Sequence, residues 1–149
     1  LKKKKLINPI IEKISNETPF LGICLGMQLL FSKSFENGEH QGLNVLDGIV
    51  ETIQKDENIK VPHIGWALLN KSTKESILLR NLKAEKSYFY FIHSFKVNSS
   101  NKNYTIHNTT YGKNSFCSAI EYKNIFGTQF HPEKSGLDGL KLLQNFLKL

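Results

Sequence analysis

The spacing of apolar residues predicts a helix, a buried strand and a second helix near the N-terminus. Apolar side chains at positions 6, 7, 10, 11 and 14 recur at the spacing of one helical face. A break at 16–19 precedes the short apolar run 20–23, which is typical of a buried strand. The apolar residues of 27–31 indicate a helix that leaves this strand.

The middle of the chain favours extended structure. Apolar and polar residues alternate at 49–53, as in an edge or half-buried strand, and 62–66 is a compact segment between strands. The aromatic-rich stretch 87–95 is extended in character, whereas the polar, Asn-rich stretch 98–114 predicts a hairpin loop with little packing.

The C-terminal third predicts two strands and a helix. The strands are 116–122 and 125–130, joined by a turn at 123–124, and the helix is the amphipathic segment 136–149, with Ser135 as its start signal. This order of elements predicts an α/β fold, with a mixed sheet flanked by helices and extra β structure in the middle. We expect one domain over 1–149.

Composition and charge narrow the function classes. The net charge is +7, but much of the excess is the run Lys2 to Lys5, and basic residues are not interleaved with aromatic ones as on a nucleic-acid surface. The apolar runs are too short to predict a membrane span or a signal peptide. We expect a soluble cytoplasmic protein without nucleic-acid or membrane partners. Cys24 and Cys117 lack metal-ligand spacing, so we expect free thiols and no metal or cofactor.

Cys24 lies between two glycines at the predicted strand-to-helix junction. The pattern G-x-C-x-G at 22–26 has the form of a nucleophile elbow with sulfur in place of oxygen. The glycines would relieve crowding, the helix N-terminus would favour the thiolate, and the Leu25 N–H would face a developing oxyanion. A structural cysteine packed between glycines fits the same pattern, so the motif alone leaves both interpretations open.

A thiolate nucleophile needs a base, and His131 is singled out among the five histidines by its setting. It ends a predicted strand, and Glu133 follows two residues later with Pro132 fixing the backbone between them. A carboxylate beside an imidazole holds its orientation and stabilises the imidazolium. Cys24, His131 and Glu133 therefore form a candidate Cys-His-Glu triad.

Two long motifs carry a family resemblance: PFLGICLGMQ at 19–28 and GTQFHPEK at 127–134. Together they resemble class I (triad) glutamine amidotransferases with a flavodoxin-like sheet. The shorter motifs PHIGW at 62–66, YFIHS at 90–94 and EKSG at 133–136 are similar to the glutaminase subunit of imidazole glycerol phosphate synthase. The resemblance spans nearly the whole chain.

The resemblance implies a role for each matching residue. Cys24 would attack the side-chain amide of L-glutamine, His131 would protonate the departing ammonia, and Glu133 would orient His131, with Leu25 at the oxyanion hole. The residues implied to hold the glutamine are Gln28, His93, Ser94 and Phe95. Trp66 and Lys134 would meet a cyclase with a (β/α)8 barrel in a heterodimer. The barrel would receive the ammonia and make imidazole glycerol phosphate and aminoimidazole carboxamide ribonucleotide in histidine biosynthesis.

Some features depart from the family pattern. Family members begin with a further strand-helix-strand stretch whose loop completes the oxyanion hole, and none precedes Cys24, so we expect an N-terminal truncation that lacks the first strands. A truncated domain could be inactive and only bind the cyclase. Ala67 stands where Asn is usual and Phe95 where Tyr is common, which leaves open a paralogue that supplies ammonia for amidation of a surface sugar. Without a partner, Trp66 could be core and Lys134 a solvated lysine. Another cysteine hydrolase would leave the motifs at 62–66 and 90–94 unexplained.

Overall fold

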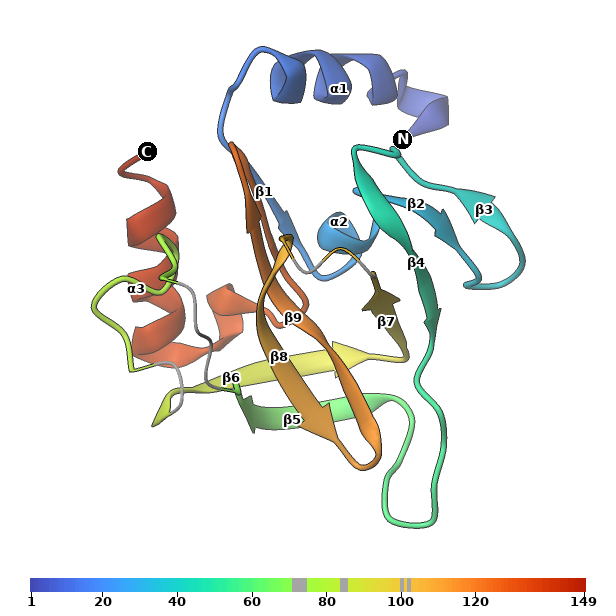
Figure 1. Ribbon diagram of the computed structural model, residues 1–149, viewed down its shortest axis with the longest axis vertical. Helices are drawn as coiled ribbons and strands as arrows, with labels where there is room; N and C mark the ends of the chain where they lie inside the picture. The colour runs from blue at the N-terminus through green and yellow to red at the C-terminus, as the bar shows by residue number, and fades with distance from the viewer. Residues whose placement is uncertain (71–74, 84–85, 100, 102) are drawn as a thin grey trace.

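The described residues form three β-sheets with helices along their sides (Figure 1). The computed structural model describes residues 1–70, 75–83, 86–99, 101 and 103–149. The helices are η1 (Lys2–Lys4), α1 (Ile7–Ser15), α2 (Leu25–Gln28), η3 (Pro132–Lys134) and α3 (Gly136–Phe146). The strands are β1 (Phe20–Ile23), β2 (Phe31–Ser34), β3 (His40–Gln41), β4 (Leu46–Thr52), β5 (His63–Leu68), β6 (Tyr88–His93), β7 (Phe95–Asn98), β8 (Thr105–Tyr111), β9 (Asn114–Tyr122) and β10 (Ile125–Thr128).

The first sheet has the strand order β1-β10-β9-β8 and carries the candidate site at one end. β1 and β10 are parallel, in a register that ends with Ile23 opposite Thr128. β9 and β10 form an antiparallel hairpin, and Lys123 adopts a left-handed conformation (φ 54°) in the predicted turn between them. Because β1 and β10 are parallel neighbours, the residues that follow them emerge side by side.

The other two sheets lie around the first. The second sheet has the order β3-β2-β4-β7, and the third is the antiparallel hairpin β5-β6, which crosses the strands of the first sheet in Figure 1. Two clusters of buried residues form the core. Ile125 belongs to one cluster and Phe126 to the other, as expected when successive side chains of a strand point to opposite faces.

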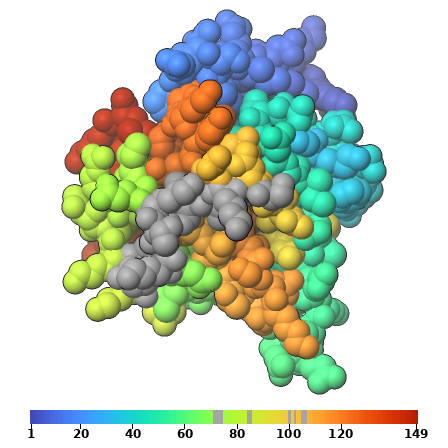
Figure 2. Space-filling view, in the orientation of Figure 1, coloured from blue at the N-terminus to red at the C-terminus, as the bar shows by residue number. Residues whose placement is uncertain are grey.

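At one end of the molecule, the loop after β4 and the β8–β9 turn are joined by hydrogen bonds. Figure 2 shows the segment after β4 projecting next to the β8–β9 turn. The Asn114 side chain accepts a hydrogen bond from the Gln54 N–H (2.9 Å) and donates one to the Gln54 carbonyl (2.9 Å), while Asp56 accepts one from the Lys113 N–H (3.2 Å). These contacts stabilise the projection without contributing to the candidate site.

Most predicted elements are confirmed, including the helix near 6–14, the strand at 20–23, the hairpin at 116–130 and the C-terminal helix. A helix leaves β1 as predicted, but its predicted extent over 27–31 is wrong, because α2 ends at Gln28 and Phe31 already starts β2. A short apolar run does not distinguish a buried helix from a buried strand.

Two further segments differ from the prediction, and a third fits one of its alternatives. The strand at 49–53 is half-buried, as predicted, rather than at an edge, because β4 pairs with both β2 and β7. The segment 62–66 lies largely within β5 instead of between strands. The stretch 98–114 contains β8, although positions 100 and 102 lie outside the described residues. β8 is polar and yet packed, because its buried side chains find acceptors: the Thr109 hydroxyl donates to the Leu68 carbonyl (3.1 Å).

Candidate active site

Cys24 occupies a sharp turn between β1 and α2. Its backbone angles, φ 51° and ψ −107°, are unfavourable for a residue with a side chain, and its N–H donates to the Thr128 carbonyl at 2.7 Å. A Cβ on Gly22 would lie 2.6 Å from the backbone of Gly26, so Gly22 is required for close packing of strand and helix. Gly26 has open space around it, so the predicted relief of crowding applies to Gly22 alone.

The Cys24 thiol is partly enclosed. It donates to the Ile92 carbonyl (3.8 Å) and accepts from the Gln129 side-chain amide (3.6 Å). Burial raises the pKa of Cys24, and the charges of Glu133 and Glu36 act in the same direction, while N–H groups of Leu25 and Gln129 oppose the rise. The sequence pattern predicts that the helix N-terminus favours the thiolate. The structure differs, because α2 has only four residues and burial prevails.

His131 and Glu133 form a close pair directly after β10. Nδ1 of His131 lies 2.6 Å from Oε1 of Glu133, across the one-turn helix η3 that begins at Pro132. Because the carboxylate accepts a hydrogen bond from Nδ1–H, the proton of the neutral imidazole stays on Nδ1. The lone pair is then on Nε2, where it can act as a base. The predicted pairing of these two side chains is therefore present.

Strand β6 brings Cys24 and His131 to the same place. The thiol of Cys24 contacts the Ile92 carbonyl, and the backbone N–H of His131 donates to the Tyr90 carbonyl at 2.8 Å. Carbonyls two residues apart in a strand point in the same direction, so both residues lie along one edge of β6. The sequence separates them by more than 100 residues, but the parallel β1–β10 pair and the edge of β6 bring them together.

Ser135 fixes the loop that carries His131. Its hydroxyl donates to the His131 carbonyl (2.6 Å) and accepts from the Tyr90 N–H (3.0 Å). The sequence predicts Ser135 as the start of the C-terminal helix, and it does occupy the N-cap position of α3, but its side chain makes no capping hydrogen bond there. The hydroxyl instead ties the His131 loop to β6.

A cleft of about 150 Å³ opens beside the sulfur. Its lining residues are Cys24, Leu25, Gln28, Glu36, Ile92, His93, Ser94 and Phe95. The residues predicted to hold the substrate all line it, and Glu36 and Ile92 are additions that the sequence patterns missed. Glu36 lies outside both family motifs, so no local signal pointed to it.

His93 is buried in the wall of the cleft and pairs with a second histidine. Its Nδ1 donates to the Phe95 carbonyl (2.8 Å), and its Nε2 lies 3.2 Å from Nδ1 of His63. Burial lowers the pKa of each imidazole to about 4, and the neighbouring imidazole lowers that of His63 further. Both histidines are therefore neutral at pH 7, and His93 contributes no charge to the wall of the cleft.

The predicted partner residues both lie on the surface. Trp66 is 53% exposed, so it is not part of the core, and its ring contacts that of Tyr90 edge to face. Ile64, Tyr88 and Ile92 are also exposed on the same face of the β5–β6 hairpin, where Ile64 stands opposite Ile92. Lys134 is exposed on η3, next to Glu133.

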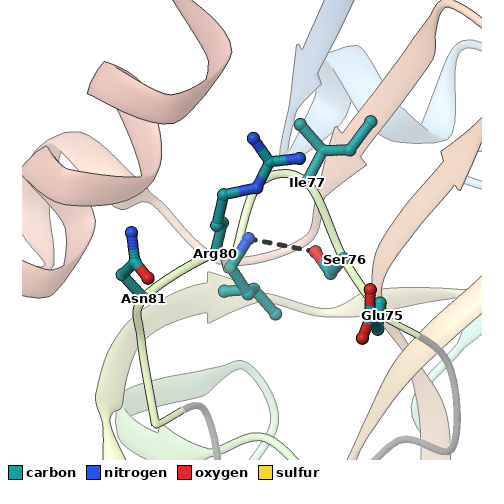
Figure 3. A pocket seen from close by; sticks show the side chains of 6 residues that line it. Glu75, Ser76, Ile77, Arg80 and Asn81 are labelled. Carbon is teal, nitrogen blue, oxygen red and sulfur yellow. Dashed lines mark hydrogen bonds between the residues drawn. The ribbon is translucent and has the colours of Figure 1, made fainter.

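A larger hollow is formed by the loop at 75–81 (Figure 3), and Cys24 is not among the residues that line it. The backbone N–H groups of Ile77 and Leu78 both donate to the carboxylate of Glu121 at 2.9 Å, so they are not available to an anion. Within the described residues no group of three His, Cys, Asp or Glu side chains could hold a metal, and no helix is long and apolar enough to cross a membrane.

Residues 2–149 match the family described as glutamine amidotransferase class-I. The chain belongs to this family. Among related class I amidotransferases, it is 47% identical over 146 residues to the imidazole glycerol phosphate synthase subunit HisH of Aquifex aeolicus, with 98% of this chain and 68% of that protein covered. It is 46% identical to subunit HisH 1 of Methanococcus maripaludis, covering 96% of this chain and 68% of the relative.

Solved structures agree on the class I amidotransferase fold. One glutamine amidotransferase structure superimposes with a TM-score of 0.68 at 15% identity, covering 99% of this chain and 69% of the other. A glutamine amidotransferase from Thermotoga maritima has a TM-score of 0.57 at 22% identity, with 97% of this chain covered, and this chain spans 53% of its length. At these identities the likeness shows the fold alone.

Proposed function

We propose that the chain is the glutaminase domain of a glutamine amidotransferase that hydrolyses L-glutamine to glutamate and ammonia. The observation that carries the proposal is the position of Cys24, on a strained elbow, with the His131–Glu133 pair on the same edge of β6 and an open cleft beside the sulfur. The HisH names of relatives more than 40% identical support a place in imidazole glycerol phosphate synthase. We propose that 1–149 forms one domain.

The proposed reaction begins with attack of the Cys24 sulfur on the side-chain amide carbon of glutamine, while Nε2 of His131 takes the thiol proton. The Leu25 N–H stabilises the resulting oxyanion. The imidazolium then gives its proton to the amide nitrogen, the C–N bond breaks, and ammonia leaves a glutamyl thioester. Water, deprotonated by His131, hydrolyses the thioester to glutamate and restores the thiol. Because burial raises the pKa of Cys24, the proton transfer accompanies the attack rather than preceding it.

The cleft suits an amino-acid substrate. Glu36 provides a carboxylate that complements the α-ammonium group of glutamine, and His93 provides a neutral wall. Gln28 lines the same cleft, but its side-chain amide is bonded to the Phe95 carbonyl and to Gln129. We therefore propose that Gln28 shapes the cleft, while Ser94 and the Phe95 segment border the bound substrate.

The exposed apolar face of the β5–β6 hairpin supports a protein partner. Ile64, Trp66 and Tyr88 are 53–56% exposed on this face, and Ile92, at 40% exposed, also contacts the Cys24 thiol through its carbonyl. Aromatic residues of this kind are frequent anchors in protein interfaces. We propose that this face and Lys134 dock a (β/α)8 cyclase in a cytoplasmic heterodimer. The ammonia would enter the cyclase without meeting water, which would otherwise protonate it to non-nucleophilic ammonium.

Measuring glutamine hydrolysis with and without the cyclase tests the proposal. Wild type with cyclase is expected to release glutamate, Cys24→Ala to release none, and Cys117→Ala, which removes the other thiol, to retain activity. Hydrolysis that survives Cys24→Ala would contradict the proposed triad. If the cyclase leaves the hydrolysis rate unchanged and a sugar-amidating partner raises it, the same chemistry belongs to a different pathway.

A further inference from the structure

We propose that Gln129 is a positioning residue that aims a side-chain N–H at the Cys24 sulfur and thereby stabilises its thiolate form. Nε2 of Gln129 lies 3.6 Å from Sγ of Cys24, and its Oε1 accepts a hydrogen bond from Nε2 of Gln28 at 3.0 Å. The inference rests on the proposed function only in treating Cys24 as the nucleophile.

The Phe95 carbonyl fixes the orientation of both amides. A backbone carbonyl can only accept hydrogen bonds, so the Gln28 atom 3.0 Å from it must be the NH₂ group. That NH₂ group also meets Gln129, and the Gln129 atom facing it must therefore be the carbonyl oxygen. The remaining end of the Gln129 side chain, which faces the sulfur, is then the donor. The Gln28 NH₂ group thus donates both to the Phe95 carbonyl and to Gln129, and the Gln129 NH₂ group donates in turn to the Cys24 sulfur.

Burial holds this arrangement in place. Gln129 is fully buried and Gln28 nearly so, and the backbone N–H of Gln129 donates to the Ser118 carbonyl at 2.9 Å. Among the described residues no buried side-chain nitrogen or oxygen lacks a partner, and the Gln28 NH₂ group and both ends of the Gln129 amide have partners within the protein. A flip of either amide would set two carbonyl oxygens or two NH₂ groups against each other in a buried site.

The charges around Cys24 explain why a neutral donor is useful. The charged groups that act on the thiol are Glu133 from the loop after β10 and Glu36 from the segment after β2, His93 from β6 lines the same cleft, and His131 is the proposed base on the edge of β6. The two carboxylates disfavour the thiolate, and His93 is neutral, so it adds no compensating charge. The Gln129 amide supplies a fixed donor that cannot itself lose a proton at physiological pH.

The test is the pH dependence of Cys24 alkylation by iodoacetamide in the full chain, followed by mass spectrometry of the Cys24 peptide so that Cys117 is not counted. Gln129→Met removes the donor at nearly constant volume and is expected to raise the midpoint by about one unit, which lowers the thiolate fraction about tenfold at neutral pH. Gln129→Glu is expected to raise it further, because a carboxylate adds negative charge beside the sulfur. Gln41→Met, on exposed β3, is the matched control and is expected to keep the wild-type midpoint.

A second variant, at Gln28, tests the hydrogen bond that holds the Gln129 amide in place. Gln28→Met leaves Gln129 in place but releases its amide, and a smaller rise of the midpoint is expected. Circular dichroism identifies which variants fold. If Gln129→Met does not fold, the alkylation midpoint of Gln28→Met decides whether the inference holds. Folded variants that keep the wild-type midpoint would overturn the inference even if the wild type hydrolyses glutamine. Raised midpoints in the variants, together with a wild type that hydrolyses no glutamine, would support the inference and contradict the proposed function.

Discussion

The backbone N–H of Cys24 donates to the carbonyl oxygen of Thr128 at 2.7 Å, directly after the last register pair of the parallel strands β1 and β10. This hydrogen bond is the point from which the two segments diverge, one into α2 and the other toward His131. The relative position of Cys24 and His131, the proposed nucleophile and base, is thus set by the sheet rather than by flexible loops, which favours precise geometry for proton transfer.

Gly22 and Gly26 make a matched pair for testing the elbow. Gly22→Ala places a methyl group 2.6 Å from the backbone of Gly26, whereas Gly26→Ala places one in open space. Gly22→Ala is expected to lower the free energy of unfolding by about 1–3 kcal/mol. Gly26→Ala is expected to change it by less than about 1 kcal/mol, in the stabilising direction, because alanine favours helix. Urea unfolding measures both, and equal losses would contradict the close packing at Gly22.

The elbow could be predicted from the sequence because it is local. The residues of 22–26 carry the turn, the glycines and the nucleophile within one motif, and β1 and α2 follow directly from it. The sequence placed Cys24 and His131 each after a predicted strand, but their position along one edge of β6 depends on the parallel pairing of β1 with β10, which the sequence did not reveal. The short length of α2, and with it the raised pKa of Cys24, could not be inferred, since burial depends on the packing of distant segments.

The contacts missed from sequence are those that join distant residues. Gln28 and Gln129 are 101 positions apart, and although each lies within one of the two long motifs, nothing in either motif indicates that the two side chains meet. The sequence correctly places Ser135 at a helix start. Its hydroxyl, however, hydrogen-bonds to the backbone of Tyr90 in β6 and of His131 in the preceding loop instead of capping α3. Polar strand β8 lacks the apolar alternation that indicates a buried strand, and its Thr109 is nevertheless buried.

Glu133→Gln tests the orientation of His131. The change keeps the shape of the side chain but replaces the carboxylate that lies 2.6 Å from Nδ1 with a neutral amide. A neutral partner stabilises the imidazolium less and permits the other tautomer, so we expect kcat to fall on the order of a hundredfold with little change in stability. Steady-state kinetics measures this, and Glu12→Gln, on exposed α1, is the control of equal charge change. An unchanged kcat in Glu133→Gln would exclude the role proposed for Glu133.

The His63–His93 pair predicts that stability falls between pH 7 and pH 5. Their pKa values are about 4 in the folded chain against an ordinary value of 6.5, so over this interval the unfolded chain binds more protons. The free energy of unfolding therefore decreases as the pH falls toward 5, by up to about 2 kcal/mol for each histidine. Urea unfolding at several pH values measures the slope, and His63→Gln is expected to reduce it. A flat profile in wild type would show that neither imidazole is held neutral.

Trp66→Ser tests the exposed face of the β5–β6 hairpin as the docking surface. Loss of a central aromatic anchor is expected to raise the Kd for the cyclase about tenfold or more, measured by calorimetry, without reducing thermal stability. Leu147→Ser, which removes a similarly accessible apolar side chain at the end of α3, is expected to leave the Kd unchanged. A similar loss in both variants, or in neither, would place the partner elsewhere.

Detection of a covalent glutamyl intermediate on Cys24 is the decisive test of Cys24 as the nucleophile. Turnover of glutamine in the presence of cyclase is quenched with acid, and the chain is digested and analysed by mass spectrometry. We expect a glutamyl adduct on the peptide that contains Cys24. This adduct should accumulate when hydrolysis of the thioester is slowed, and it should be absent in Cys24→Ala. Glutamine hydrolysis without any adduct on Cys24, or with an adduct on Cys117 instead, would contradict this role of Cys24.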